Sequence, residues 1–256
     1  MFKDIKASVA AYGKALDLIK KLKLAKYFIA PIMISVITGA LIITLAYLLS
    51  ESIGNWIAQI WVFDFGAETV STISHIIGGL LVFALGLILF KHIVMALSAP
   101  FMSPVSEKIE KHMTGEVYVD NSAKGVSKSL ARGIRINVRN LFMEFLFVIP
   151  FVLLSFIPVI GLVFSFLVFL VQAYYAGFGC MDYTLERHYS YRESIPFVRK
   201  NRGLAYGNGA IFILLLLIPV LGVFIVLPLS TVASTTETLK RLEYEGKVKL
   251  IPEKVN

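Results

Sequence analysis

The feature that most constrains this chain is a run of apolar residues from Tyr27 to Leu49 that contains no charged side chain. A helix rises about 1.5 Å per residue, so about 20 helical residues cross a hydrocarbon core of about 30 Å. A second apolar run, from about Ile76 to Leu97, is also long enough. The two runs predict full transmembrane helices over residues 27–49 and 76–98.

The composition of the chain excludes a soluble domain. Of its 256 residues, 57% are apolar and 16% are charged, and the mean hydropathy is +0.76. A soluble domain of this length cannot bury so much apolar surface, so the excess must face lipid. We therefore expect one all-α integral membrane domain over residues 1–256.

Two further apolar stretches, residues 141–176 and 204–233, are each interrupted by the sequence Ile-Pro-Val-apolar-Gly. Proline disfavours helix at the residue before it and glycine permits a tight reversal, which predicts a helix, a turn and a returning helix. The outgoing arms, residues 141–156 and 204–217, would be about 24 and about 21 Å long. We therefore expect two half-penetrating helical hairpins, with two ordinary kinked spans as the alternative. Because lipid cannot hydrogen-bond a turn, such hairpins favour an oligomer or a pore.

The distribution of charge predicts the topology. Residues 50–75 contain no Lys or Arg, whereas the other polar stretches are rich in both, so this segment faces outside and the termini face the cytoplasm. Residues 1–26 combine apolar residues at spacings of three and four with lysines, which is typical of an amphipathic helix on a membrane surface. Residues 102–140 are expected to form cytoplasmic helices and residues 236–256 a cytoplasmic tail.

The sharpest cationic cluster consists of Lys124, Lys128, Arg132, Arg135 and Arg139, whose spacings of four, four, three and four place them on one helical face. Two interpretations fit this cationic stripe. It could concentrate anions at the cytoplasmic mouth of a pathway, or it could hold phospholipid headgroups, which is the common use of such faces.

Other charged residues lie within or beside the apolar segments. Lys91 and His92 lie near the inner end of the second span, where we expect Lys91 to extend toward the headgroups. Glu144 lies inside an apolar arm, so we expect it to face the bundle or a cation such as Arg139 or Arg135, and to form a structural ion pair rather than a proton relay. The residues predicted to form structural ion pairs are Glu107, Glu144, Asp182, Arg187 and Arg202.

The sequence contains no catalytic motif, and its four histidines are scattered. The single cysteine, Cys180, offers neither a disulfide nor a zinc-binding spacing. We therefore predict no enzymatic activity, catalytic residue, cofactor or metal site. The net charge of +8 comes from cations that flank apolar segments, so membrane lipid rather than nucleic acid is the expected partner.

Several short segments, each weak alone, form a specific combination. They are Ala99-Pro100-Phe101 with Glu107 and Thr114-Gly115, Phe156 to Gly161, Asp182-Tyr183 with Arg187, Asn201-Arg202, and Ile218 to Leu221 with Leu227-Pro228. Their order and spacing, from about Gly13 to Arg241, resemble the CysZ-type sulfate permeases, relatives of the etoposide-induced membrane protein family. The resemblance implies an oligomeric channel or permease in the inner membrane of a bacterial cell, supplying sulfate for cysteine biosynthesis. It also implies two long helices and two hemi-penetrating hairpins in each subunit.

The resemblance further implies an anion-binding motif, a Gly-apolar-Arg-Arg turn just before the first span. The motif falls on Lys23, Leu24, Ala25 and Lys26, so this chain lacks its glycine and both arginines. Glycine lets the backbone approach an oxyanion and arginine binds it bidentately, whereas a lysine offers a hydrated point charge.

Two functional hypotheses follow. The first is an oligomeric inner-membrane permease or channel for sulfate or a related oxyanion, passive or proton-assisted. The alternative is a non-transporting membrane-organising or envelope-assembly protein, in which the hairpins enter one leaflet and the basic helices bind anionic lipid.

Overall fold

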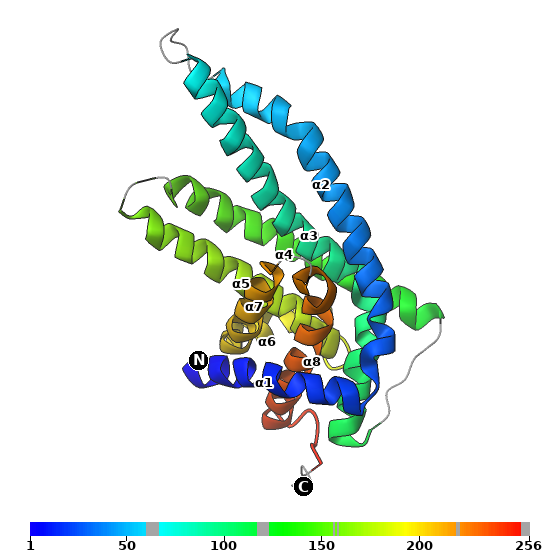
Figure 1. Ribbon diagram of the computed structural model, residues 1–256. Coiled ribbons are helices and arrows are strands. Elements are labelled where there is room, and N and C mark those ends of the chain that lie inside the picture. The colour runs from blue at the N-terminus through cyan, green and yellow to red at the C-terminus, as the bar shows by residue number, and fades with distance from the viewer. Residues whose placement is uncertain (60–66, 117–122, 156, 158, 219–220, 252–256) are drawn as a thin grey trace.

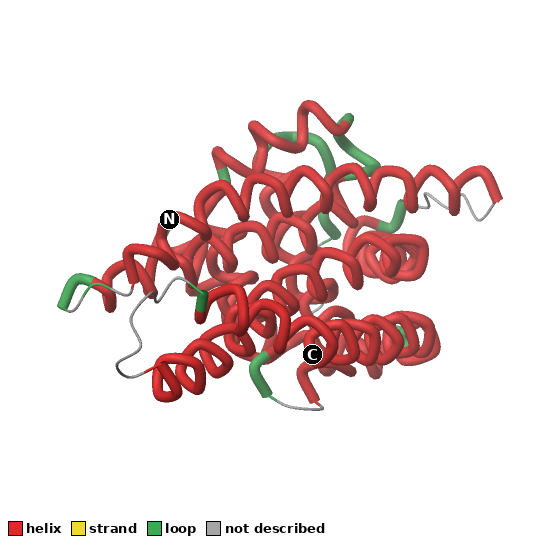
Figure 2. Tube along the Cα trace, turned by 90° about the horizontal axis from the view of Figure 1, so that it is seen from above, coloured by secondary structure: helices red, strands yellow, loops and turns green. Residues whose placement is uncertain are grey.

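The computed structural model describes residues 1–256 except 60–66, 117–122, 156, 158, 219–220 and 252–256. This described part contains helices and loops but no strand (Figure 2). The predicted all-α membrane fold is confirmed, because four segments of the described chain are helical, long and apolar enough to cross a membrane. These segments are Leu24–Trp56, Leu85–Thr114, Lys124–Ser155 and Gly161–Leu185.

The helices pair into hairpins that share a common base (Figure 1). α2 and α3 form one long hairpin, α4 and α5 form a second that points in another direction, and α7 and α8 form a shorter pair. α1 lies across α7 and α8. In chain order the elements are α1 (Phe2–Lys21), the 3-10 helix η1 (Leu24–Tyr27), α2 (Ile29–Ala58), α3 (Ala67–Thr114), α4 (Ala123–Ser155), α5 (Gly161–Leu185), α6 (Tyr191–Lys200), α7 (Arg202–Leu216) and α8 (Leu221–Tyr244).

α3 continues beyond residue 98, the predicted end of the second span, and runs on through Pro100 and Pro104. Each proline removes one helical hydrogen bond. Met102 and Ile109, however, are fully buried in the core, so tertiary packing stabilises the helix past the prolines. The C-terminal part of α3 therefore belongs to the packed interior.

α4 is one continuous helix of 33 residues. The sequence predicts cytoplasmic helices up to residue 140 and a hairpin from residue 141, but α4 crosses this boundary without interruption. Asn140 and Glu144 are both fully buried, so the contacts of α4 with its neighbours also continue across it. The cationic stripe and the outgoing arm of the hairpin are thus parts of the same helix.

The reversal predicted from the Pro and Gly residues is present between α4 and α5. The N–H of Gly161 donates to the carbonyl oxygen of Ile157 at 2.8 Å. A Cβ atom at position 161 would overlap the carbonyl oxygen of Ser155, and Gly222 stands in the same relation to the end of α7. Glycine is therefore required because the returning helix approaches the outgoing arm closely.

The two hairpins differ in the length of their arms. α4 and α5 have 33 and 25 residues, whereas α7 has 15. At about 1.5 Å per residue, α7 is too short to cross a hydrocarbon core of about 30 Å. α4 is long enough, but its first half carries the cationic stripe, so its apolar part begins near Leu141.

α1 has two different apolar faces. One face packs on α7 and α8, where the hydroxyl of Tyr12 donates to the carbonyl oxygen of Asn208 at 2.8 Å. The other face presents Phe2, Val9 and Leu16, which are all exposed. α1 is thus attached to the bundle by one face and leaves the second free to contact lipid.

Small residues bring α5 and α7 into close contact. A Cβ atom on Gly177 would overlap the carbonyl oxygen of Ala205, and one on Gly209 would overlap that of Ala173. Such pairs of small residues allow helix backbones to approach closely in membrane proteins. The α5–α7 contact therefore fixes the two hairpins against each other.

Candidate functional site

A hollow of about 580 Å³ opens between α4 and the connection from α5 to α6. Part of the cationic stripe lies on its wall, together with residues that sequence reasoning did not select. We call it the basic hollow. Its lining consists of Lys128, Ala131, Arg132, Arg135, Glu186, Arg187, His188, Tyr189, Ser190 and Tyr191.

Arg132 connects the elements that surround the basic hollow. Its Nε and Nη2 atoms donate to the two carboxylate oxygens of Asp182 at 2.9 and 2.8 Å. Its Nη1 atom donates to the carbonyl oxygen of Tyr189 at 2.7 Å, and Nη2 also contacts Ser194. Because Asp182 neutralises its charge and all three guanidinium nitrogens donate hydrogen bonds, Arg132 joins α4 to α5 and α6 rather than offering a free positive charge.

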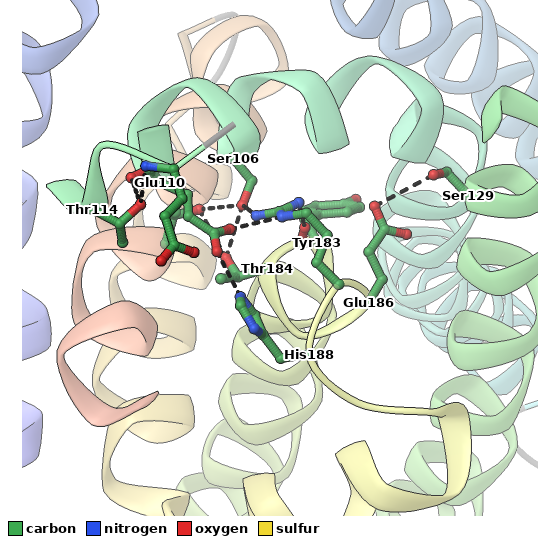
Figure 3. A network of polar contacts seen from close by, with 11 residues as sticks. Ser106, Glu110, Thr114, Ser129, Tyr183, Thr184, Glu186 and His188 are labelled. Atoms are coloured by element: carbon green, nitrogen blue, oxygen red, sulfur yellow. Dashed lines mark hydrogen bonds and ion pairs between the residues drawn. The ribbon is translucent and has the colours of Figure 1, made fainter. Parts of the chain in front are cut away.

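Arg187 and His188 are also compensated by a carboxylate. Arg187 donates through Nε to Glu110 at 2.7 Å and through Nη2 to Ser106 at 2.7 Å. The His188 Nε2 atom lies 2.7 Å from the other oxygen of Glu110, and Ser106 continues the network to Thr184 at 2.9 Å (Figure 3). Glu110 is therefore the partner of the predicted ion-pair residue Arg187, although no sequence motif distinguishes it from Glu107.

The other cations of the stripe have different environments. Lys124 and Lys128 are exposed. Arg135 is exposed and its guanidinium lies 4.1 Å from the centroid of the Tyr191 ring. Arg139 is half-buried, donates to the side chain of Asn140 at 3.0 Å and lies outside the basic hollow. Within the described part of the chain, Lys128 and Arg135 are thus the lining cations that form no ion pair.

Glu186 is the carboxylate of the basic hollow. Ser129 donates to it at 3.4 Å (Figure 3). Burial raises the pKa of the Glu186 carboxyl and the nearby charge of Asp182 adds to this, while Arg187 and Arg132 act in the opposite direction. Glu186 is therefore a carboxyl group that gains a proton more readily than an exposed glutamate.

The predicted anion motif lies in the turn between α1 and α2. Lys23 has φ 51° and ψ 47°, the left-handed conformation that glycine adopts without strain. Leu24 is fully buried, whereas Lys23, Ala25 and Lys26 are exposed. The ammonium groups of Lys26 and of Lys108, from α3, lie 5.3 and 5.4 Å from the ring centroid of Tyr27. The turn thus places Lys23 in the left-handed conformation and gathers three lysines.

A buried charged network joins α3 to α4, and it differs from the sequence prediction. The Lys91 Nζ atom lies 2.6 Å and the His92 Nε2 atom 2.9 Å from the two carboxylate oxygens of Glu144. The three side chains are between 0% and 2% exposed. The prediction that Lys91 extends to the headgroups is therefore wrong, whereas Glu144 does face the bundle and form a structural ion pair, with Lys91 rather than with Arg139 or Arg135. An unpaired charge is costly in a low-dielectric interior. The ionisable groups of the two apolar helices therefore pair with each other.

The geometry of His92 fixes where hydrogens lie in this network. The Asn137 amide nitrogen donates to the carbonyl oxygen of Gly133 at 2.9 Å, so its oxygen faces the His92 Nδ1 atom at 3.2 Å. Nδ1 must then carry a hydrogen. The Nε2 atom on the other side of the ring faces a carboxylate oxygen of Glu144 at 2.9 Å.

The remaining predicted ion-pair residues lie at the edges of the bundle. Glu107 is half-buried on α3, and Arg202 is exposed at the start of α7, where the described residues offer it no ion pair. Within the same described ranges, no three His, Cys, Asp or Glu side chains gather to hold a metal ion.

Four membrane-capable helices, buried ion pairs between them and exposed cations at the ends of two of them define an α-helical integral membrane protein. The chain belongs to the family described as "Sulfate transporter CysZ/Etoposide-induced protein 2.4", whose sequence model matches residues 11–226. The resemblance found in the sequence is thereby confirmed. This family places the chain among membrane transport proteins of the sulfate transport class.

Two named relatives come from Vibrio species. The chain is 26% identical over 245 residues to the sulfate transporter CysZ of Vibrio parahaemolyticus serotype O3:K6, covering 91% of this chain and 94% of the relative. It is 25% identical over 226 residues to the protein of the same name from Vibrio cholerae serotype O1, covering 84% and 86%.

Proposed function

We propose that this chain is a permease or channel for sulfate or a closely related oxyanion. The observation that carries the proposal is the family match over residues 11–226, together with relatives named sulfate transporters that align over nearly the whole chain. The exposed lysines at the turn before α2 and the exposed cations beside the basic hollow support it, since clustered positive charge raises the local concentration of an anion.

The setting of this activity is part of the same proposal. The chain is a multi-pass protein of a bacterial inner membrane with cytoplasmic termini, and it supplies sulfate for cysteine biosynthesis. α7 and α8 form a half-penetrating hairpin because α7 is too short to cross. A homo-oligomer is part of the proposal, because a hairpin turn inside the membrane has backbone groups that lipid cannot satisfy.

The test is uptake of radiolabelled sulfate into liposomes that contain the purified protein, against empty liposomes. We expect saturable uptake that other oxyanions inhibit by competition. The double variant Lys23→Gln, Lys26→Gln should reduce uptake per protein, because it removes two charges from the turn before α2. A matched control is Lys14→Gln, which removes an exposed charge from the middle of α1.

The second candidate is the membrane-organising or envelope-assembly protein that binds anionic lipid. The observation in its favour is that lysines replace the glycine and one arginine of the anion motif, and alanine the other arginine. Absence of uptake for every oxyanion, with binding to anionic vesicles retained, would replace the first proposal with this one.

A further inference from the structure

The basic hollow carries an excess of uncompensated positive charge. Asp182 neutralises Arg132, and Glu110 neutralises Arg187 and contacts His188. What remains on the wall is Lys128 and Arg135 on one side and the carboxyl group of Glu186 on the other. The space of about 580 Å³ is ample, since a water molecule occupies about 30 Å³ in the liquid. An oxyanion with part of its hydration shell therefore fits.

Arg135 is positioned to donate hydrogen bonds to such a ligand. Its guanidinium lies over the ring of Tyr191, a contact that holds the plane of the group. None of its N–H groups has a hydrogen-bond acceptor in the part of the chain that the structure describes. Lys128 lies two helical turns away on the same face of α4 and reaches the same wall.

The start of α6 is not the anion-binding element. The backbone N–H of Ser190, at the N-terminus of this helix, already donates to the carboxylate of Glu193 at 2.8 Å. Glu193 thus satisfies the helix end and places a negative charge beside it. The two side chains of α4 are therefore the donors that a ligand would use.

Glu186 links the occupancy of the hollow to protonation. The charged groups that act on it are Arg132 from α4, Asp182 from α5 and Arg187 from the chain that follows α5, while Lys128, Arg135 and His188 line the same hollow. Burial raises the pKa of Glu186, and an anion bound nearby would raise it further by like-charge repulsion. Protonation of Glu186 would remove the negative charge that opposes the anion.

We propose that the basic hollow binds a tetrahedral oxyanion between Lys128 and Arg135, with the Glu186 carboxyl group gaining a proton as the anion binds. The ligand class comprises free sulfate or phosphate and the phosphate of a lipid headgroup, which share this chemistry. The inference rests on the proposed function only in naming sulfate as the free ion. Affinity then falls as the pH rises through the pKa of Glu186, because the deprotonated carboxylate repels the ligand.

Calorimetric titration of the full chain, in a non-ionic detergent, with sodium sulfate and with inorganic phosphate tests the site. We expect Lys128→Gln and Arg135→Gln each to weaken binding about tenfold, the effect of losing one charge-assisted contact. The affinity of Arg135→Lys should be intermediate between that of these variants and that of the wild type, since lysine keeps the charge but lacks the planar donor edge of arginine. Lys124→Gln is the matched control, because Lys124 belongs to the same stripe but lies outside the hollow.

The pH dependence tests the role of Glu186. In a pH series that rises from about 4.3, the usual pKa of a glutamate, the wild type should bind sulfate more tightly at the acidic end, whereas Glu186→Gln should bind equally across the series and as tightly as the protonated wild type. Equal weakening by Lys124→Gln and Lys128→Gln, or wild-type binding that does not change with pH, would overturn the inference. Unchanged unfolding temperatures of the variants ensure that the affinities refer to folded protein.

Two further comparisons identify the source of the ligand and separate this inference from the proposed function. The first comparison uses nanodiscs of phosphatidylcholine with and without phosphatidylglycerol. If phosphatidylglycerol lowers the sulfate affinity of the wild type but not that of Arg135→Gln, the ligand of the hollow is a lipid headgroup. No such loss assigns it to the free ion, and no binding in either environment counts against the site. Binding without liposome uptake contradicts the proposed function, whereas uptake without binding at the hollow contradicts this inference.

Discussion

At the scale of single residues, the carboxylate of Glu144 holds Lys91 and His92 in the interior between α3 and α4. A buried ion pair gains little net stability over an apolar replacement, because desolvation of both charges offsets their attraction. Removing one partner is different, since the other charge is then left buried and uncompensated.

We therefore expect Glu144→Ala to destabilise the protein by about 3 to 5 kcal/mol. Unfolding in mixed micelles, followed by circular dichroism, measures the change. The double variant Lys91→Met, Glu144→Leu should recover most of the loss, because neither charge remains. An alanine variant as stable as the wild type, or a double variant no better than Glu144→Ala, would contradict this account of the network.

At the scale of elements, the turn between α1 and α2 stores backbone strain at Lys23. Its φ of 51° is unfavourable for a residue with a Cβ atom. Lys23→Gly should therefore stabilise the fold by about 0.5 to 1 kcal/mol, measured by the same unfolding experiment. Lys14→Gly, at an exposed position inside α1, should instead cost about 1 kcal/mol. If both substitutions destabilise equally, the left-handed conformation at position 23 is not the cause.

The elements also show how far the sequence predicts this fold. Apolar length predicted α2, and the Pro and Gly residues predicted both short-range reversals, because these signals are local. The sequence did not predict that α3 passes through Pro100 and Pro104 or that α4 crosses residue 140. In both places the helix is maintained by buried contacts with other helices, which local propensity does not contain.

The candidate site was less accessible to sequence reasoning for the same reason. The spacing of the cationic stripe correctly placed its members on one helix. Their partners, Asp182 for Arg132 and Tyr191 for Arg135, come from segments far away in the sequence. Glu110 and Glu186 lack any motif, so only the packing of α3, α4 and α5 reveals that they compensate or oppose these cations.

At the scale of the whole molecule, the depth to which the α4–α5 hairpin enters the bilayer decides how many times the chain crosses the membrane. Val159, at the tip of the hairpin, is 89% exposed and has φ 70°. Both arms are long enough to cross, yet the apolar part of α4 begins only near Leu141. We expect this part, about 22 Å at the helical rise, to leave the tip inside the hydrocarbon core.

Cysteine labelling distinguishes a half-penetrating hairpin from a full crossing. In a Cys180→Ala background, single cysteines at Ser52, Ser127 and Val159 are treated with a membrane-impermeant maleimide from each side. Ser127, beside the cationic stripe, should react only from the cytoplasmic side, and Ser52 only from the outside, because cations remain cytoplasmic. Val159 should react from neither side, since the bilayer core excludes the reagent. Reaction of Val159 from the side of Ser52 would show that α4 and α5 cross completely, and reaction of Ser127 from both sides would show that the chain inserts in two orientations.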